Sequence, residues 1–186
     1  MNIYEEARNK AWEFLIQNKI NSLPISISDI CRSNDIRLLR DTKEIILPRN
    51  IRGGTFLHEG NYFIVVRGSD SLQAQRYTAA HELGHIWLEH PMTDSKYGRT
   101  FSVSKKDPIE YQAERFAIDI LAPACILWAI GLRTPEEIAA VCNISPTAAR
   151  YRAERMSELY ARNTFLLHPL EREVHKQFKG FIEKAQ

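Results

Sequence analysis

The sequence predicts an α+β protein, in which a small antiparallel sheet packs on one long helix and a helical region follows. Three observations support this class. Short apolar runs separated by turn residues lie between residues 36 and 66. The stretch from Leu72 to His90 contains no Pro and ends before Pro91, as an uninterrupted helix would. Beyond Pro123 only helical patterns are found.

The N-terminal segment predicts two helices. Residues 3 to 19 place apolar side chains at helical spacing among charged ones, and Pro24 ends that region. Ser28 can cap a short second helix that runs to about Ser33. Neither helix carries groups that indicate chemistry, and helices of this kind usually pack on a sheet.

Four short runs predict the strands of the sheet: Ile36–Leu39, Ile45–Leu47, Thr55–Leu57 and Tyr62–Val66. The last two bracket His58-Glu59-Gly60-Asn61, a sequence typical of a hairpin turn. The sheet therefore precedes the helix that begins after Ser69-Asp70-Ser71, where each residue offers an N-cap oxygen.

That helix contains His81-Glu82-Leu83-Gly84-His85. The two histidines are one turn apart on the same face, so that both rings can bind one metal ion. Glu82 is rotated about 100° from His81, which places it beside a water on the metal and not among its ligands. The alternative is that both histidines are hydrogen-bonded core residues with no metal.

The next predicted helix supplies candidates for a third ligand, which a catalytic zinc site with two histidines requires. It begins at Asp107-Pro108 and ends at Pro123. Glu110 can bind the metal, Glu114 can take that place, or Glu110 can form a capping box with Asp107 and bind nothing. If Glu110 is the ligand, Glu114 can accept a hydrogen bond from the free ring nitrogen of a ligating histidine.

The stretches YTAAHELGHIWLEH (77–90) and EYQAERFAIDILAP (110–123) together resemble the ImmA/IrrE family of bacterial metallo-endopeptidases. The resemblance implies a zincin-like core with one zinc ion per chain, bound by His81, His85 and Glu110, and with Glu82 as the catalytic residue. The family usually has Asn or Asp where this chain has Glu114, so the outer hydrogen bond assigned to Glu114 departs from the family pattern, whereas the three ligands match it. The implied domains are a zincin-like metallopeptidase over 1–125 and a helical region over 126–186.

The same resemblance implies a function. Such a protein is expected to be a zinc-dependent endopeptidase that cleaves a helix-turn-helix transcriptional repressor of a phage, mobile element or stress regulon. Zincin-like folds place an exposed strand beside the metal helix, where an extended substrate can pair with it. We expect Tyr62–Val66 or its partner strand to have this role.

The C-terminal region predicts a helix-turn-helix arrangement. Thr134-Pro135-Glu136-Glu137 starts one helix, residues 143–145 interrupt it, and a second helix runs from Pro146 to about Arg162. The second helix carries Arg150, Arg152 and Arg155, but nearby glutamates dilute their charge. A regulator that binds DNA or protein, with a structural or vestigial metal site, is therefore the alternative function. A last amphipathic helix is expected near residues 170–184.

Composition limits the remaining possibilities. The 186 residues include 25 Lys and Arg against 23 Asp and Glu, and a net charge of +2 gives no strong field for nucleic acid or membrane. Cys31, Cys125 and Cys142 show no CxxC spacing, which favours buried thiols in a reducing compartment. The sequence shows no signal peptide and no long apolar span, so we expect a cytoplasmic protein without a membrane partner.

Overall fold

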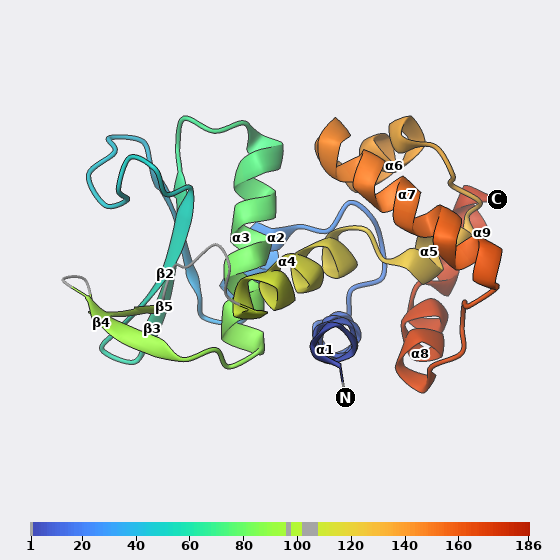
Figure 1. Ribbon diagram of the computed structural model, residues 1–186, viewed down its shortest axis with the longest axis horizontal. Helices are drawn as coiled ribbons and strands as arrows, with labels where there is room; N and C mark the ends of the chain where they lie inside the picture. Colours follow the sequence, from blue (N-terminus) through green and yellow to red (C-terminus); the bar gives the residue numbers. More distant parts are fainter. Residues whose placement is uncertain (1, 96–97, 102–107) are drawn as a thin grey trace. The chain divides into compact units, whose positions relative to one another are not determined.

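The computed structural model describes residues 2–95, 98–101 and 108–186 (Figure 1). In chain order the elements are α1 (Ile3–Gln17), α2 (Ile27–Ser33), β1 (Arg37–Asp41), β2 (Gly53–His58), β3 (Asn61–Arg67), α3 (Leu72–Trp87), β4 (Met92–Ser95), β5 (Gly98–Phe101), α4 (Pro108–Leu121), α5 (Ala124–Ala129), α6 (Pro135–Cys142), α7 (Pro146–Arg162), α8 (Pro169–Gln177) and α9 (Lys179–Ala185). The chain is thus α+β, as predicted.

Two compact units divide the chain. The first contains residues up to Ala7 and Ser26–Ala117, and the second contains Arg8–Ile25 and Ile118–Gln186. Most of α1 therefore belongs to the helical unit and not to the unit with the sheet. In the helical unit, Gln177 of α8 donates to the carbonyl oxygen of Leu15 at 2.8 Å, and Leu15 is buried. The predicted domain boundary after residue 125 stays a prediction.

The sheet of the first unit has the strand order β1-β3-β2-β5-β4. The pairs β2–β3, β2–β5 and β4–β5 are antiparallel, but β1 runs parallel to β3. The prediction of a purely antiparallel sheet is therefore wrong. The connection between β1 and β2 skips one strand position in the sheet, and β3 fills that position. β3 therefore pairs with β1 on one side and forms a hairpin with β2 on the other.

The predicted hairpin between β2 and β3 is confirmed. His58 pairs with Asn61, and the two turn residues Glu59 and Gly60 have φ values of 48° and 77°. Two successive left-handed residues are the geometry of the type I′ turn, whose twist matches that of the strands. Because β3 lies between β1 and β2, the Tyr62–Val66 segment is an interior strand with both edges paired. Its partner β2 lies between β3 and β5, and the described residues of β5 pair with it only at Phe56 and Leu57, so the start of β2 remains the candidate for substrate pairing.

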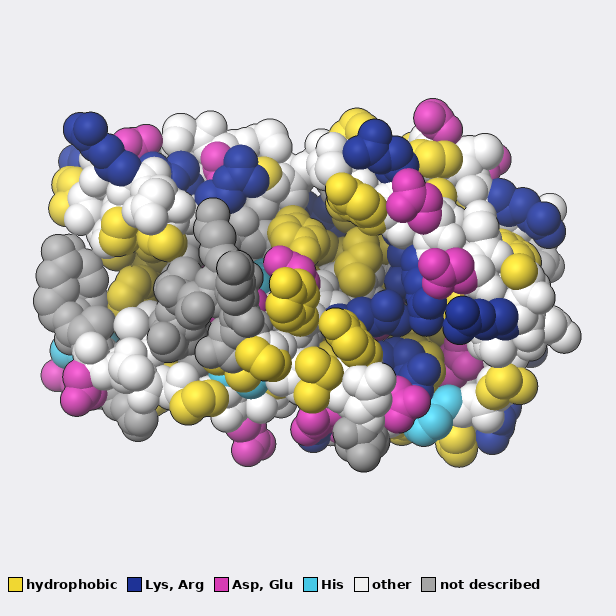
Figure 2. All heavy atoms as spheres, in the orientation of Figure 1, with side chains coloured by type: hydrophobic (Ala, Val, Ile, Leu, Met, Phe, Trp, Pro, Cys, Tyr) yellow, Lys and Arg dark blue, Asp and Glu magenta, His cyan; other side chains and the backbone are white. Residues whose placement is uncertain are grey.

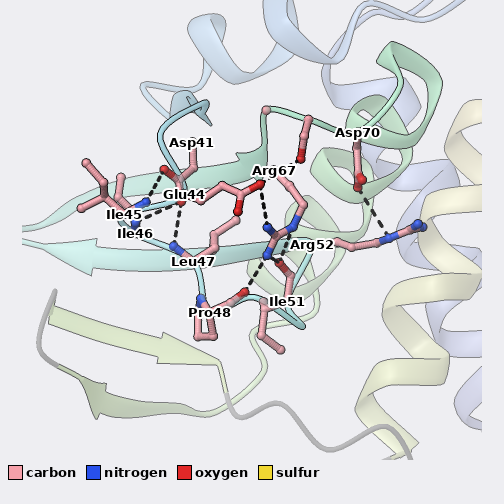
Figure 3. Close-up of polar contacts among 12 residues, drawn as sticks. Asp41, Glu44, Ile45, Ile46, Leu47, Pro48, Ile51, Arg52, Arg67 and Asp70 are labelled. Atoms are coloured by element: carbon pink, nitrogen blue, oxygen red, sulfur yellow. Dashed lines mark hydrogen bonds and ion pairs between the residues drawn. The ribbon is translucent and has the colours of Figure 1, made fainter.

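The predicted strand at Ile45–Leu47 does not form. The carboxylate of Asp41 accepts hydrogen bonds from the backbone N–H groups of Ile45, Ile46 and Leu47, at 3.0, 3.0 and 2.8 Å (Figure 3). These donors are the groups that a strand would offer to its neighbour. The bond from Leu47 is the largest of the effects that lower the pKa of Asp41 below its ordinary value. The apolar run is therefore a turn, with Leu47 buried beneath it.

Arg67, at the end of β3, holds the other side of the β1–β2 loop (Figure 3). Its guanidinium donates to the carbonyl oxygens of Ile51 and Pro48, each at 2.6 Å, and lies 3.5 Å from the carboxylate of Glu44. Together with Asp41 it fixes the segment that leads into β2. The loop thereby sets where β2 begins.

The helix α3 packs beside the sheet (Figure 1), with Ala79, Ala80 and Leu83 buried together with the β3 residues Ile64–Val66. Ser71 is its N-cap and accepts a hydrogen bond from the backbone N–H of Ala74, as one of the three predicted caps. The helix ends at Trp87, three residues before the predicted end, because Glu89 adopts a left-handed conformation with φ of 54°.

Other helix boundaries differ in detail from the prediction. The cap of α2 is Ser26 and not Ser28, because the Ser26 hydroxyl accepts from the backbone N–H of Asp29. The helix α4 spans Pro108–Leu121 as predicted, while Asp107 lies outside the described residues. The hairpin β4–β5 was not predicted because its segment has no alternating apolar pattern.

The second unit is helical, as predicted for this region. The capping box at Thr134 and Glu137 starts α6, and Asn143, in the left-handed region with φ of 50°, ends it before α7. The expected last helix forms two pieces, α8 and α9, which meet at the buried Phe178. The short helix α5 was not predicted.

Two further observations concern the cysteines and the length of apolar helices. All three cysteines are buried, and burial raises the pKa of Cys31 to about 12. In the part of the chain that the structure describes, no helix combines the length and the apolar character that a bilayer crossing demands.

Candidate metal centre

The two histidines of the HExxH sequence converge on one point. Both project from α3, and their Nε2 atoms are 3.0 Å apart. The rings meet edge to face, with centroids separated by 4.8 Å and an interplanar angle of 68°. His85 is almost fully buried, and the His81 side chain is 16% exposed. One turn of helix therefore presents two imidazole lone pairs to the same place.

Glu110 of α4 completes the group. Its Oε2 lies 3.3 Å from His81 Nε2, and its Oε1 lies 3.4 Å from His85 Nε2. The sequence alone left Glu110 as a ligand or as a capping residue. The structure places its carboxylate within 3.4 Å of both ring nitrogens, where it can share a metal ion with them, and its assignment as the ligand stays a prediction.

Gly84 allows α4 to come this close to α3. A Cβ at Gly84 would lie 3.1 Å from Ala113 Cα and 3.2 Å from the Ala113 carbonyl oxygen. Both distances are tighter than ordinary carbon contacts, so any side chain here would push the helices apart. Gly84 of the HELGH sequence thus lets α4 pack close enough to α3 for Glu110 to reach the two histidines.

The three donors fit a tetrahedral metal ion. Ligands at the usual zinc distances of about 2.0–2.2 Å lie roughly 3.3 Å apart along the edges of a tetrahedron. The distances of 3.0, 3.3 and 3.4 Å are close to that value, and the ligand atoms all lie within 4.8 Å of one another. Among the described residues, His81, His85 and Glu110 form the one group of this kind. Three protein ligands leave one position for solvent or substrate.

The pKa values of the two histidine rings are shifted in opposite directions. Burial, together with the neighbouring His81 and His90, lowers the pKa of His85 to about 3, so that this ring is neutral. Burial would also lower the pKa of His81, but the hydrogen bond to Glu110 and the charges of Glu82, Glu110 and Glu114 raise it above its ordinary value. A metal ion that binds here competes with a proton at His81.

Glu82 lies next to this group but outside it. Its side chain is buried, and the Thr55 hydroxyl of β2 donates to its Oε2 at 2.8 Å. Burial raises the pKa of Glu82, with opposing effects from His81 and Thr55. A carboxylate with a raised pKa is a stronger base than one in water, which suits proton transfer near neutral pH. The role of Thr55 gives no signal in the sequence, because 27 positions separate it from Glu82.

Gly53 brings the start of β2 against the same part of α3. A Cβ built at Gly53 would lie 2.2 Å from Thr78 Cγ2, 3.2 Å from the Val65 carbonyl oxygen and 3.5 Å from Glu82 Oε1. The strand can therefore pass this close to the helix only with glycine at that position. The close approach also brings Thr55 within hydrogen-bonding distance of Glu82.

The second nitrogen of His85 has an unexpected partner. His85 Nδ1 lies 2.8 Å from Nδ1 of His90, which is buried just beyond the end of α3. The sequence had indicated Glu114 for such an outer hydrogen bond. Glu114 is exposed on α4, where its charge acts on His81, so its predicted role stays a prediction and concerns the His81 ring.

The chain also matches the model of a known protein family. The model of the IrrE N-terminal-like domain, peptidase family M78, matches residues 36–154, from the start of the sheet into α7. A search of curated proteins finds no match. The matched range covers more than half of the chain and includes the HExxH helix and Glu110. The chain therefore belongs to the IrrE N-terminal-like domain family and is a metallopeptidase with a candidate His81/His85/Glu110 zinc site.

Proposed function

We propose that this metallopeptidase is a zinc-dependent endopeptidase in which Glu82 is the general base. The observation that carries the proposal is the separation of two kinds of carboxylate. Glu110 lies between the two imidazoles, whereas the buried Glu82 is held by Thr55 beside them and is not part of the donor group.

The chain's own residues then have distinct tasks. His81, His85 and Glu110 would hold zinc, which when bound supplies a Lewis acid that acidifies water and polarises a carbonyl group. Thr55 fixes Oε2 of Glu82, and Oε1 takes the proton of the attacking water. Glu82 then donates that proton to the leaving amine, so the base is restored after each cleavage.

The start of β2 is the best place for an extended peptide substrate. The described residues of β5 pair with β2 at Phe56 and Leu57, and the Thr100 hydroxyl donates to the Thr55 carbonyl oxygen at 2.7 Å. Gly53 and Gly54 lie beyond these contacts, next to the residue that holds Glu82. A peptide that adds to this segment by backbone hydrogen bonds would present its carbonyl groups near Glu82.

The proposed substrate is a helix-turn-helix transcriptional repressor, and the site acts in the cytoplasm. This choice rests on the resemblance to the ImmA/IrrE family. The test is co-expression with the repressor encoded beside the gene for this chain, followed by mass spectrometry of the products. We expect a single cut with the wild-type chain and no cut with Glu82→Gln.

Metal analysis separates the roles within the site. Glu82→Gln should retain one zinc per chain and lose cleavage, whereas His85→Ala should lose both. Glu89→Gln is the matched control, because Glu89 is exposed near the end of the same helix. Cleavage that persists in Glu82→Gln refutes the base assignment, and a wild-type protein that binds no zinc refutes the metal centre.

The alternative, a DNA-binding regulator, receives little support from α7. Arg152 is buried and forms an ion pair with Asp119 at 2.9 Å, so it is not available to phosphate. Arg155 pairs with Glu158 on its own helix. Over the helical part of Figure 2, Lys and Arg side chains lie next to Asp and Glu side chains on the face shown. A phosphate-binding surface normally has a clear basic excess.

A further inference from the structure

The end of α3 is a Schellman motif that brings His90 back to His85. The backbone N–H of His90 donates to the carbonyl oxygen of His85 at 3.1 Å, and that of Glu89 donates to Ile86 at 3.1 Å. Glu89 supplies the left-handed residue that this motif requires, with φ of 54°. In this motif, the residue that follows the left-handed one lies against the residue five positions before itself. Here both of these residues are histidines.

The side chains of this pair also meet. The two Nδ1 atoms are 2.8 Å apart, and the rings lie edge to face at 4.9 Å and 72°. Both residues are buried, so water cannot readily replace either partner. A contact between two ring nitrogens at this distance needs one proton between them, which makes one ring the donor and the other the acceptor.

The direction of this hydrogen bond follows from the candidate metal site. Nε2 of His85 faces His81 and Glu110, and metal binding requires a lone pair there. The proton of a neutral His85 must then be on Nδ1, which donates to Nδ1 of His90. His90 is the acceptor and carries its own proton on Nε2.

We propose that His90 is a positioning residue for the metal centre: it accepts the Nδ1 hydrogen bond of His85 and thereby fixes the tautomer and the orientation of that ligand. The inference rests on the proposed metal site and extends it beyond the three ligands. Outer hydrogen bonds of this kind usually change metal affinity by roughly 10- to 100-fold.

The test compares His90→Leu with His90→Asn. Leucine fills much of the space but has no acceptor, whereas the Asn Oδ1 occupies a position close to that of Nδ1 and can accept the same hydrogen bond. We expect zinc affinity, measured by competition with a chromophoric chelator, to fall roughly 10- to 100-fold in His90→Leu and to recover in His90→Asn. The visible spectrum of the Co²⁺-loaded protein should change in the leucine variant and return toward wild type in the asparagine variant.

Two controls distinguish this role from packing. Glu89→Gly keeps both histidines and relieves the left-handed backbone, so its zinc affinity should equal that of the wild type. Thermal unfolding of the metal-free variants shows whether either His90 substitution disturbs the fold. Equal zinc affinity in wild type and His90→Leu, or equal losses in the Leu and Asn variants, overturns the inference while leaving the zinc site intact. A wild-type chain that binds no zinc instead overturns the proposed function.

Discussion

The close approach of β2 to α3 at Gly53 yields a quantitative prediction for Gly53→Ala. The added Cβ would lie 2.2 Å from Thr78 Cγ2, whereas carbon atoms in contact are normally at least about 3.5 Å apart. With Thr78 in its present rotamer, strand and helix must therefore separate by about 1.3 Å. The Thr55–Glu82 hydrogen bond, now 2.8 Å, would lengthen toward about 4 Å and be lost.

The expected cost combines overpacking with a lost hydrogen bond to a buried carboxylate, and we place it at about 2–4 kcal/mol. For a chain of this length, each kcal/mol lowers the melting temperature by about 2–4 °C, so the loss should be roughly 5–15 °C. Thermal unfolding followed by circular dichroism measures it, with the metal removed from all samples.

Two companion variants make the test specific. Gly54→Ala places its Cβ 3.5 Å from Phe56 and 3.6 Å from Leu47, which are ordinary contacts, so it should be tolerated. Thr78→Ser removes the clashing Cγ2 and should restore most of the stability of Gly53→Ala. A melting temperature for Gly53→Ala within about 1 °C of wild type would refute the reasoning, as would a failure of Thr78→Ser to rescue it.

Three further predictions concern other parts of the chain. Glu110→Ala should weaken zinc binding at least about a hundredfold in chelator competition, because a site with four ligands binds zinc with about 10–16 kcal/mol, or roughly 3 kcal/mol per ligand. An unchanged zinc affinity would favour the capping role of Glu110. The depressed pKa of Asp41 stabilises the fold above pH about 4, and this contribution is lost as the pH falls through the folded-state pKa. Urea unfolding should therefore show that the difference in stability between wild type and Asp41→Asn becomes smaller in acid. A difference that stays constant with pH would contradict this. Arg152→Ala leaves Asp119 buried without its partner and should cost about 3–5 kcal/mol in urea unfolding, while a loss below about 1 kcal/mol would show that the pair is not needed.

Local patterns were sufficient for the elements that carry the candidate ligands. The spacing of His81 and His85 fixes their common face once the segment is helical, and Ser71 marks where that helix starts. Pro91 sets only an outer limit for its end, since the left-handed Glu89 ends the helix at Trp87. The Glu59-Gly60 turn is equally local, since its left-handed residues determine the register of the hairpin. Glu110 was harder, because spacing rules allowed two roles and only the resemblance to a family chose between them.

The failed predictions depended on partners that are distant in sequence or on unusual backbone. Ile45–Leu47 has the composition of a strand, but the Asp41 carboxylate takes its N–H groups. The parallel pairing of β1 with β3 depends on the path of a loop, which no periodicity reveals. His90 was missed because residues five apart do not share a helix face, and Glu89 gives no sequence signal for a left-handed conformation.

The way in which the β1–β2 loop is held has a practical use. Asp41 and Arg67 hold the loop chiefly by hydrogen bonds to its main-chain groups. The outward-facing side chains of the loop therefore contribute little to its shape. Ile45 is 67% exposed there. A cysteine at this position could carry a fluorescent label a few residues ahead of the strand next to Glu82. Arrival of a peptide could then be followed in real time without altering any group that acts on it.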